Sequence, residues 1–224
     1  MDRITSFIAK STLYLFGWHP LDEKILTALK NNQYLVCVFS HTSYYDFFFM
    51  VLYYLSYPNE LLHLKTLIKP DYFKTLGWLL YRIGGIPSTH ISQRNGGATK
   101  KIIDTLKSYS SSQLLISPKG TILKGEWRTG YYYIAQSLQA PVIAIGVDYE
   151  EKKIRLGNLI DYQLSENEIK YKLYRDLSQI VPLYPEREMM KIRKYNSYDL
   201  NVIHPERLFT FYLFIMTSIC YMYK

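Results

Sequence analysis

Short apolar runs alternate with longer segments of helical period along the middle of the chain. A brief, continuously apolar run bounded by polar residues is typical of a buried strand, and 34–40 (YLVCVFS) and 140–149 (APVIAIGVDY) fit this description best. Strands that alternate with helices predict an α/β fold, a single domain in which helices flank a mostly parallel or mixed central sheet. The predicted strands are 34–40, 61–68, 113–117, 140–149 and 152–156, with a tight turn or short strand at 84–87. The predicted helices follow residue 40 and cover 71–82, 98–107, 129–139 with Thr129 as its cap, and a stretch from 165 onward.

Both ends of the chain are apolar. Residues 3–18 are interrupted by Lys10 and no small-residue cleavage site follows, so they predict an amphipathic N-terminal helix instead of a secretory signal. The 16 residues 208–223 carry no charge. As a helix they reach about 24 Å, short of the hydrocarbon layer of about 30 Å. We therefore expect an α/β domain over 1–200 and an apolar helix over 206–224 that either anchors the protein in a membrane or docks on the core.

Composition narrows the class of protein. The 224 residues are 48% hydrophobic, which is enough for one sizeable core and excludes disorder. Two cysteines, Cys37 and Cys220, support neither a disulfide framework nor a cysteine zinc site. The net charge of +8 favours an anionic partner: a phosphate compound, a membrane surface or nucleic acid. Nucleic acid is the weakest of these because no clustered basic and aromatic motif is present.

Several common catalytic motifs are absent from the sequence, namely G-x-G-x-x-G, G-x-x-x-x-G-K-[ST], H-E-x-x-H and G-x-S-x-G. What stands out is an H-x4-D formed by His41 and Asp46, directly after the strand predicted at 34–40. On one continuous helix the two side chains would point roughly 140° apart. They meet only if His41 lies in the turn and Asp46 begins the next helix.

Two interpretations of this motif stay open. In the first, Asp46 accepts from one imidazole nitrogen and leaves the other free as a general base. In the second, Ser43 and Asp46 merely form a capping box for a helix. A dyad of this kind needs a substrate with its own nucleophile, such as an alcohol, and an activated acyl donor. Cys37 is an alternative nucleophile, but a cysteine inside an apolar strand is typically inert.

A second constellation follows the strand predicted at 113–117. The sequence Ser-Pro-Lys-Gly-Thr at 117–121 places a glycine turn and Lys119 at the carboxyl end of that strand. Backbone N–H groups and a cation at such a turn can bind a phosphate, although an ordinary turn has the same sequence.

Taken in order, these segments resemble the glycerolipid acyltransferases, in particular the bacterial-type 1-acylglycerol-3-phosphate acyltransferases. Four blocks within about residues 34–149 carry the resemblance. The family's H-x4-D falls on His41 and Asp46. Its fourth block, an apolar strand opened by a proline, is similar to 140–145.

The second and third blocks match with substitutions. The second, usually Gly-Gly-Ile-Pro with two residues and an Arg after it, is similar to 84–90, where His90 replaces the Arg. The third, usually Pro-Glu-Gly-Thr-Arg, is similar to 118–122, where Lys119 replaces Glu and Ile122 replaces Arg. The run 127–135 (WRTGYYYIA) also resembles one between the third and fourth blocks of some members.

The resemblance implies roles for these residues. His41 would be the catalytic base and Asp46 would orient it. The second and third blocks would hold the phosphate and glycerol of the acceptor. Losing Arg at 90 and 122 removes two bidentate phosphate partners, for which Arg94 and Lys119 substitute only in part, so a different headgroup is open. The substrate-binding residues expected from the resemblance are Gly85, His90, Arg94, Lys119, Gly120 and Thr121.

The resemblance thus predicts an O-acyltransferase. It would move a fatty acyl group from acyl-CoA or acyl carrier protein to a hydroxyl of a glycerol-phosphate or lysophospholipid acceptor, without a metal or a further cofactor. We expect it at a membrane surface, with the active site facing the cytoplasm and no nucleic-acid partner. The alternative is a catalytically silent relative that binds lipid or membrane, which the substitutions at Lys119 and Ile122 favour.

Overall fold

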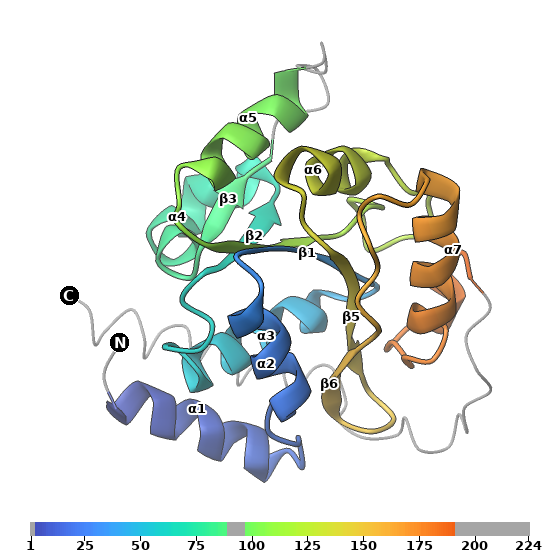
Figure 1. Cartoon of the computed structure of the whole chain (residues 1–224). Helices are drawn as coiled ribbons and strands as arrows, with labels where there is room; N and C mark the ends of the chain where they lie inside the picture. The colour runs from blue at the N-terminus through green and yellow to red at the C-terminus, as the bar shows by residue number, and fades with distance from the viewer. Residues whose placement is uncertain (1–2, 89–96, 191–224) are drawn as a thin grey trace. The chain divides into compact units, whose positions relative to one another are not determined.

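The computed structural model describes residues 3–88 and 97–190. All of them belong to one compact unit that ends at Arg193. Its strands are β1 (Tyr34–Phe39), β2 (Leu64–Ile68), β3 (Gly85–Pro87), β4 (Ser112–Ile116), β5 (Val142–Asp148) and β6 (Lys153–Leu156). They form one sheet in the order β3-β2-β4-β1-β5-β6, drawn in Figure 1. The neighbours β3-β2-β4-β1-β5 are parallel and β6 is antiparallel to β5, so the sheet is mixed.

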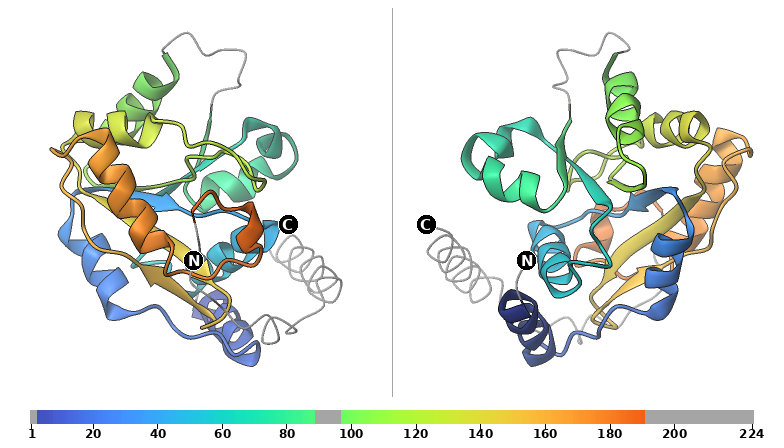
Figure 2. Two further views of the ribbon diagram at one scale, coloured as in Figure 1. Left: turned by 90° about the vertical axis from the view of Figure 1, so that its right-hand side faces the viewer. Right: turned by 60° about the vertical axis from the view of Figure 1, so that its left-hand side comes forward.

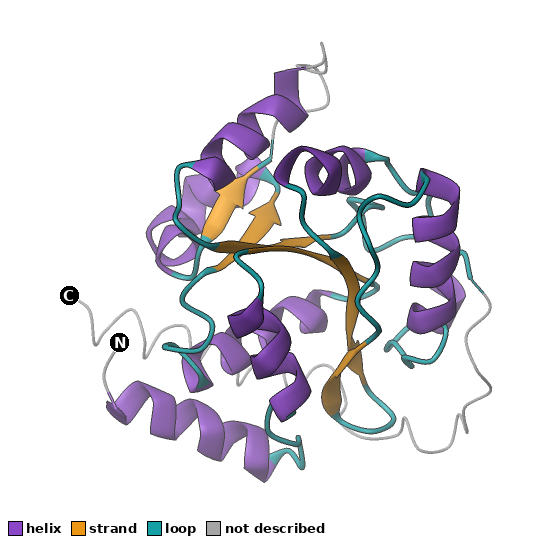
Figure 3. Ribbon diagram, in the orientation of Figure 1, coloured by secondary structure: helices purple, strands orange, loops and turns teal. Residues whose placement is uncertain are grey.

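Helices cover both faces of this sheet, and the predicted α/β class is confirmed. In Figures 1 and 3, α5, α6 and α7 lie on one side of the strands, and α2 and α3 lie on the other. The helices are α1 (Arg3–Leu15), α2 (Glu23–Asn31), α3 (Tyr44–Ser56), α4 (Phe73–Arg82), α5 (Gly97–Lys107), α6 (Gly130–Leu138) and α7 (Glu166–Leu177). The segments η1 (Pro70–Tyr72) and η3 (Pro185–Arg187) are short 3-10 helices.

The larger core lies between the sheet and α5, α6 and α7. Alternate residues of the three central strands face it, because successive side chains of a strand point to opposite faces. These residues are Val36, Val38, Leu114, Ile116, Val142 and Ala144, and the helices add Leu106, Ile134, Leu173 and Leu177, among others. The intervening strand residues, such as Cys37 and Ile143, are equally buried on the opposite face.

An aromatic cluster stabilises the opposite face near the end of β5. Trp18, which follows α1, stacks on Phe49 of α3 with ring centroids 3.8 Å apart. Tyr149 meets both rings edge-on, at 5.5 Å from Trp18 and 5.9 Å from Phe49. At the other end of α3, the Ser6 hydroxyl of α1 donates to the carbonyl of Ser56 at 2.8 Å.

Most predicted elements are present, with shifted ends. β2 begins three residues later than expected, and the helix expected from Asp71 begins as a 3-10 turn before α4. The predicted strands at 152–156 and 84–87 are β6 and β3. The helix α2 was not predicted; Asp22 caps it by accepting from the amide of Lys24 at 2.9 Å.

The predicted cap of α6 is wrong in its mechanism. Thr129 occupies the N-cap position, but its side chain makes no cap hydrogen bond. Its backbone already has helical dihedral angles, φ −82° and ψ 0°, whereas a capping side chain usually sits on an extended residue.

Within the described part of the chain, none of the helices has the length and apolar character needed to cross a bilayer. The expected apolar helix over 206–224, and the expected domain boundary at 200, lie outside the described residues.

The topology brings several sequence blocks to one edge of the sheet. β1 lies between β4 and β5 and is parallel to both, so the carboxyl ends of these three strands share an edge. The residues after β1 include His41 and those after β4 include Lys119; the residue after β5 is Tyr149.

Candidate active site

The loop between β1 and α3 carries the H-x4-D motif. The strand ends at Phe39, and Ser43 caps α3 by accepting from the amide of Tyr45 at 3.1 Å. His41 therefore lies in the turn, and Asp46 is the third residue of the first helical turn. This is the arrangement that the spacing of the two residues requires if their side chains are to meet.

The imidazole and the carboxylate are in direct contact. Nδ1 of His41 lies 3.1 Å from Oδ2 of Asp46. The His41 side chain is 24% exposed, whereas that of Asp46 is 2% exposed. A buried carboxylate accepts a hydrogen bond from the Nδ1–H group, and in the neutral imidazole this tautomer leaves Nε2 as the nitrogen without a proton. The geometry therefore suits a base that faces a substrate, and the catalytic roles of both residues stay predictions.

The capping interpretation also holds. The amides of Thr42 and Ser43 donate to Oδ2 of Asp46 at 2.8 and 2.9 Å, and the reciprocal capping box with Ser43 is complete. One carboxylate oxygen thus both starts α3 and holds the imidazole. The two interpretations that the sequence left open describe the same side chain.

Tyr149 completes the surroundings of Asp46 and was missed from sequence. Its hydroxyl donates to Oδ1 of Asp46 at 2.7 Å. Burial, and then the neighbouring Asp46 carboxylate, raise the pKa of Tyr149 well above its ordinary value of 10.0, so the hydroxyl keeps its proton. Tyr149 closes the strand predicted at 140–149, but only the order of strands in the sheet shows that it reaches Asp46.

The second block lies at β3, where its two glycines are needed for packing. Gly84 has φ +79°, and a Cβ there would lie 2.3 Å from the carbonyl oxygen of Leu64. A Cβ on Gly85 would lie 2.6 Å from the carbonyl oxygen of Leu80. These contacts explain the glycines without a ligand. The expected binding residues His90 and Arg94 lie outside the described residues.

Lys119 of the third block lies in a buried ion pair. Its Nζ is 2.9 Å from Oε1 of Glu188, and both side chains are 1% exposed. It also donates to the carbonyl of Arg187 at 3.2 Å. An ammonium group in this position neutralises a buried carboxylate and is not presented at the surface. Glu188 is a second residue that the sequence analysis missed.

The glycine turn of the third block is present beside Lys119. Gly120 has φ +63°, and the guanidinium of Arg128 lies 3.4 to 3.9 Å from the position that a Cβ there would take. Thr121 accepts from the amide of Leu123 at 3.2 Å. Arg128 is exposed and makes no ion pair within the described residues.

Cys37, on β1, is the alternative nucleophile that the sequence analysis considered. Burial raises the pKa of the Cys37 thiol to about 12, so it is a poor nucleophile. Over residues 3–88 and 97–190, no group of three His, Cys, Asp or Glu side chains is arranged to hold a metal ion.

We compared the chain with models of known protein families. The model of the Acyltransferase family matches residues 22–148, which run from the N-cap of α2 to the end of β5. The chain belongs to the acyltransferase family. No individual curated protein matches it. Membership makes this a transferase that takes an acyl donor and a lipid acceptor, and it places His41, Asp46 and the 117–121 turn inside the family region.

Proposed function

We propose that this acyltransferase moves a fatty acyl group from an acyl thioester, on coenzyme A or acyl carrier protein, to a hydroxyl of a glycerol-phosphate or lysophospholipid acceptor. The observation that carries the proposal is the contact of the partly exposed His41 imidazole with the buried Asp46 carboxylate at the end of β1. The family match supports the acyl transfer itself.

The reaction follows from the protonation of the imidazole. Nε2 of His41 takes the proton of the acceptor hydroxyl, and the oxygen attacks the thioester carbonyl. The tetrahedral intermediate collapses, the C–S bond breaks, and the imidazolium returns its proton to the leaving thiolate. The thioester supplies the activation, so the scheme uses no metal or further cofactor. The amides of Thr42 and Ser43 donate to Asp46, and the oxyanion is therefore stabilised by other donors.

A phosphate on the acceptor is supported by Arg128. The third block has Ile122 where relatives with its usual pattern have Arg, and the ammonium of Lys119 is engaged by Glu188. Arg128 offers a planar guanidinium against the same glycine turn, at the edge of the sheet that carries His41. Such a group binds phosphate through two parallel hydrogen bonds.

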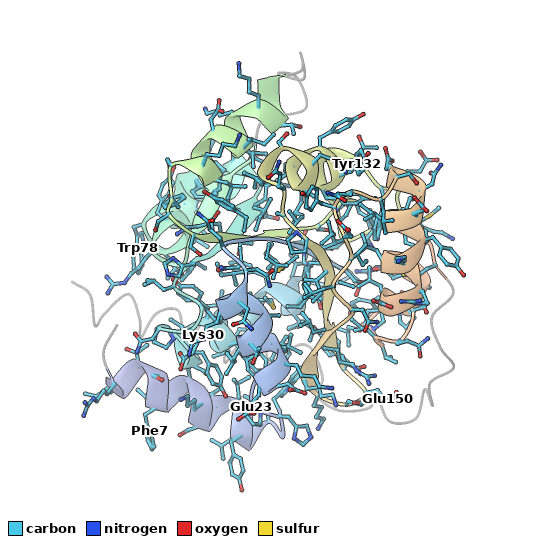
Figure 4. The ribbon with its side chains drawn as sticks, viewed as in Figure 1. Phe7, Glu23, Lys30, Trp78, Tyr132 and Glu150 are labelled. Atoms are coloured by element: carbon cyan, nitrogen blue, oxygen red, sulfur yellow. The ribbon has the colours of Figure 1, made fainter. Side chains whose placement is uncertain are left out.

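Association with a membrane surface is supported by α1. Its inner residues Ala9 and Leu13 are 3% exposed, whereas its outer face is an apolar stripe. Figure 4 shows Phe7 projecting away from the sheet. Basic residues of a chain with net charge +8 add attraction to anionic lipid. The stripe consists of Ile4, Phe7, Ile8, Tyr14 and Leu15, which are 48 to 82% exposed.

On the same proposal, the active site faces the cytoplasm.

The central test is product formation by purified protein. Wild type with acyl-CoA or acyl carrier protein and a panel of lysolipids should yield acylated product by mass spectrometry, and His41→Ala should lose nearly all turnover while its circular dichroism is unchanged. A folded His41→Ala with normal turnover refutes the proposal. Wild type that binds lysolipid but never acylates it supports the silent relative instead.

The acceptor site is tested by Arg128→Gln, with Arg175→Gln on α7 as the control of equal charge change. Loss of a charged hydrogen-bonding partner, about 1.5 kcal/mol, should raise the KM for a phosphate-bearing acceptor roughly tenfold. The KM for the acyl thioester and for monoacylglycerol should not change. Equal effects of both variants would contradict a local role for Arg128.

The membrane surface is tested by flotation with anionic vesicles. Phe7→Glu with Leu15→Glu should release the protein, and deletion of 208–224 tests the second apolar segment separately. Flotation that neither change affects would remove the membrane from the proposal.

A further inference from the structure

The segment after α7 returns to the sheet edge that carries His41. Figure 2 shows the deep-orange chain that follows α7 turning back toward the central strands. The segment 184–188 contains η3 and lies beyond residues 22–148, the part that the family model matches. We call it the 184–188 segment.

This segment bonds to the residues on both sides of His41. Before it, the Ser40 hydroxyl donates to Oε1 of Glu188 at 2.7 Å. After it, Nη1 of Arg187 donates to the carbonyl of Thr42 at 2.8 Å. The amide of Tyr184 also points to the Thr42 hydroxyl, at 3.4 Å. The backbone of His41 is therefore held from two sides while Asp46 holds its ring.

The same segment joins two loops through one atom. Oε1 of Glu188 accepts from Ser40 after β1 and from Lys119 after β4. The other oxygen, Oε2, is buried and has no hydrogen-bond partner among the described residues. Every polar contact of this carboxylate thus serves to tie the loop of His41 to the third block.

A buried ion pair adds little net stability, but removing one partner leaves a charge that the interior does not solvate. Such a pair fixes geometry more than it adds free energy of folding. Fixed geometry matters at His41, because a displacement of about 1 Å at a reacting group can lower turnover on the order of a hundredfold.

We infer that the 184–188 segment is a positioning clamp for His41, with Arg187 and Glu188 as positioning residues that act through Thr42 and Ser40. The inference rests on the proposed function, since it assigns the clamp to the same reaction. It extends the functional unit about 40 residues beyond the end of the family region at 148.

Kinetics of small substitutions test the clamp. Ser40→Ala removes the bond to Glu188 but keeps the pair with Lys119, and Ser56→Ala is its control because Ser56 is also buried and donates to a backbone carbonyl in α3. Ser40→Ala should lower kcat about fivefold and Arg187→Met about tenfold, with the KM for the acyl thioester unchanged. Arg187→Lys keeps a donor for Thr42 and should recover part of the loss.

Stability is measured on the same variants, because a merely structural role would lower the unfolding midpoint and leave kcat of the folded fraction intact. Full kcat in folded Ser40→Ala and Arg187→Met, or an equal loss in Ser56→Ala, overturns the clamp.

A second readout does not depend on activity. Long-range ¹H–¹⁵N NMR spectra, assigned with His41→Gln, should show a single Nδ1–H tautomer for His41 in wild type. Ser40→Ala with Arg187→Met should give mixed or exchange-broadened signals. Unchanged His41 signals overturn the clamp even if the wild type proves inactive, whereas changed signals in an inactive wild type support the clamp and refute only the proposed function.

Discussion

The loops that follow β1 and β4 lie side by side on parallel strands, yet they are held in different ways. The loop of His41 carries the H-x4-D motif, and the partner of the imidazole, Asp46, lies five positions away and also caps α3. In the loop that follows β4, the partner of Lys119 is Glu188, which lies 69 positions away. The contact of His41 with Asp46 is therefore set by the local sequence, whereas Lys119 has its ion-pair partner only because a distant segment returns to it. That distant segment also bonds to Ser40 and Thr42, on either side of His41.

The largest effect is expected from a change in the first loop, Asp46→Asn. The amide keeps the size of the side chain but no longer enforces the Nδ1–H tautomer of His41, so turnover should fall on the order of a thousandfold. The measurement is kcat of purified, folded protein. Asp176→Asn, another buried acceptor, is the control and should keep its turnover. Comparable losses in both variants would contradict a special role for Asp46.

The second loop is best disturbed by Lys119→Met. It leaves the Glu188 carboxylate buried without its cation, which should lower the free energy of unfolding by about 3–5 kcal/mol. The double variant Lys119→Met with Glu188→Met removes both charges and should recover most of this loss. Urea unfolding measures both variants. A double variant as unstable as the single one would mean that the pair is not the cause.

A smaller effect is expected for Tyr149→Phe. Loss of the hydrogen bond to Asp46 should lower the free energy of unfolding by about 1–2 kcal/mol. Tyr131→Phe is the control, because the Tyr131 hydroxyl is buried with no hydrogen-bond partner among the described residues. Its removal should cost nothing.

The pH dependence of stability provides a second test of the hydrogen bond between Tyr149 and Asp46. The folded pKa of Tyr149 is raised above 10.0, so the stability that this phenol contributes is complete below pH 10 and is lost as the pH rises beyond it. Wild type should therefore lose more stability than Tyr149→Phe when the pH rises from about 9 to about 11, across the ordinary pKa of a tyrosine. Parallel curves for the two proteins would contradict the assigned shift.

The smallest effect is expected at Cys37. With a raised thiol pKa of about 12 and 1% exposure, it should resist iodoacetamide in the folded protein. Cys37→Ala should keep turnover within about twofold of wild type. Peptide mapping by mass spectrometry separates Cys37 from Cys220. Rapid alkylation with loss of activity would favour the thiol as nucleophile.

Local patterns explain what could be predicted from sequence. The strands β1 and β5 are long apolar runs, and the contact of His41 with Asp46 follows from a turn and a capping box within six residues. Such features depend on neighbouring residues alone, which is why they could be derived before the structure was known.

The remaining features depend on sheet order and on distant segments. Tyr149 reaches Asp46 only because β5 lies beside β1, and Lys119 is buried only because the 184–188 segment returns to it. The helix α2 is different, because its buried residues Ile25 and Leu29 are four positions apart and Asp22 is a typical N-cap, so the sequence analysis missed a local signal there. Arg128 lies beside Gly120 because the loop between them folds back, and that loop has no regular hydrophobic pattern from which the contact could be predicted.

The double use of Asp46 couples the activity of the enzyme to the fraying of one helix. Because the same oxygen accepts from the amides of Thr42 and of the N-cap residue Ser43, and also from the imidazole, a fluctuation that opens the capping box of α3 also releases the base. On heating, activity should therefore decline before the protein as a whole unfolds, with the start of α3 acting as its thermal weak point.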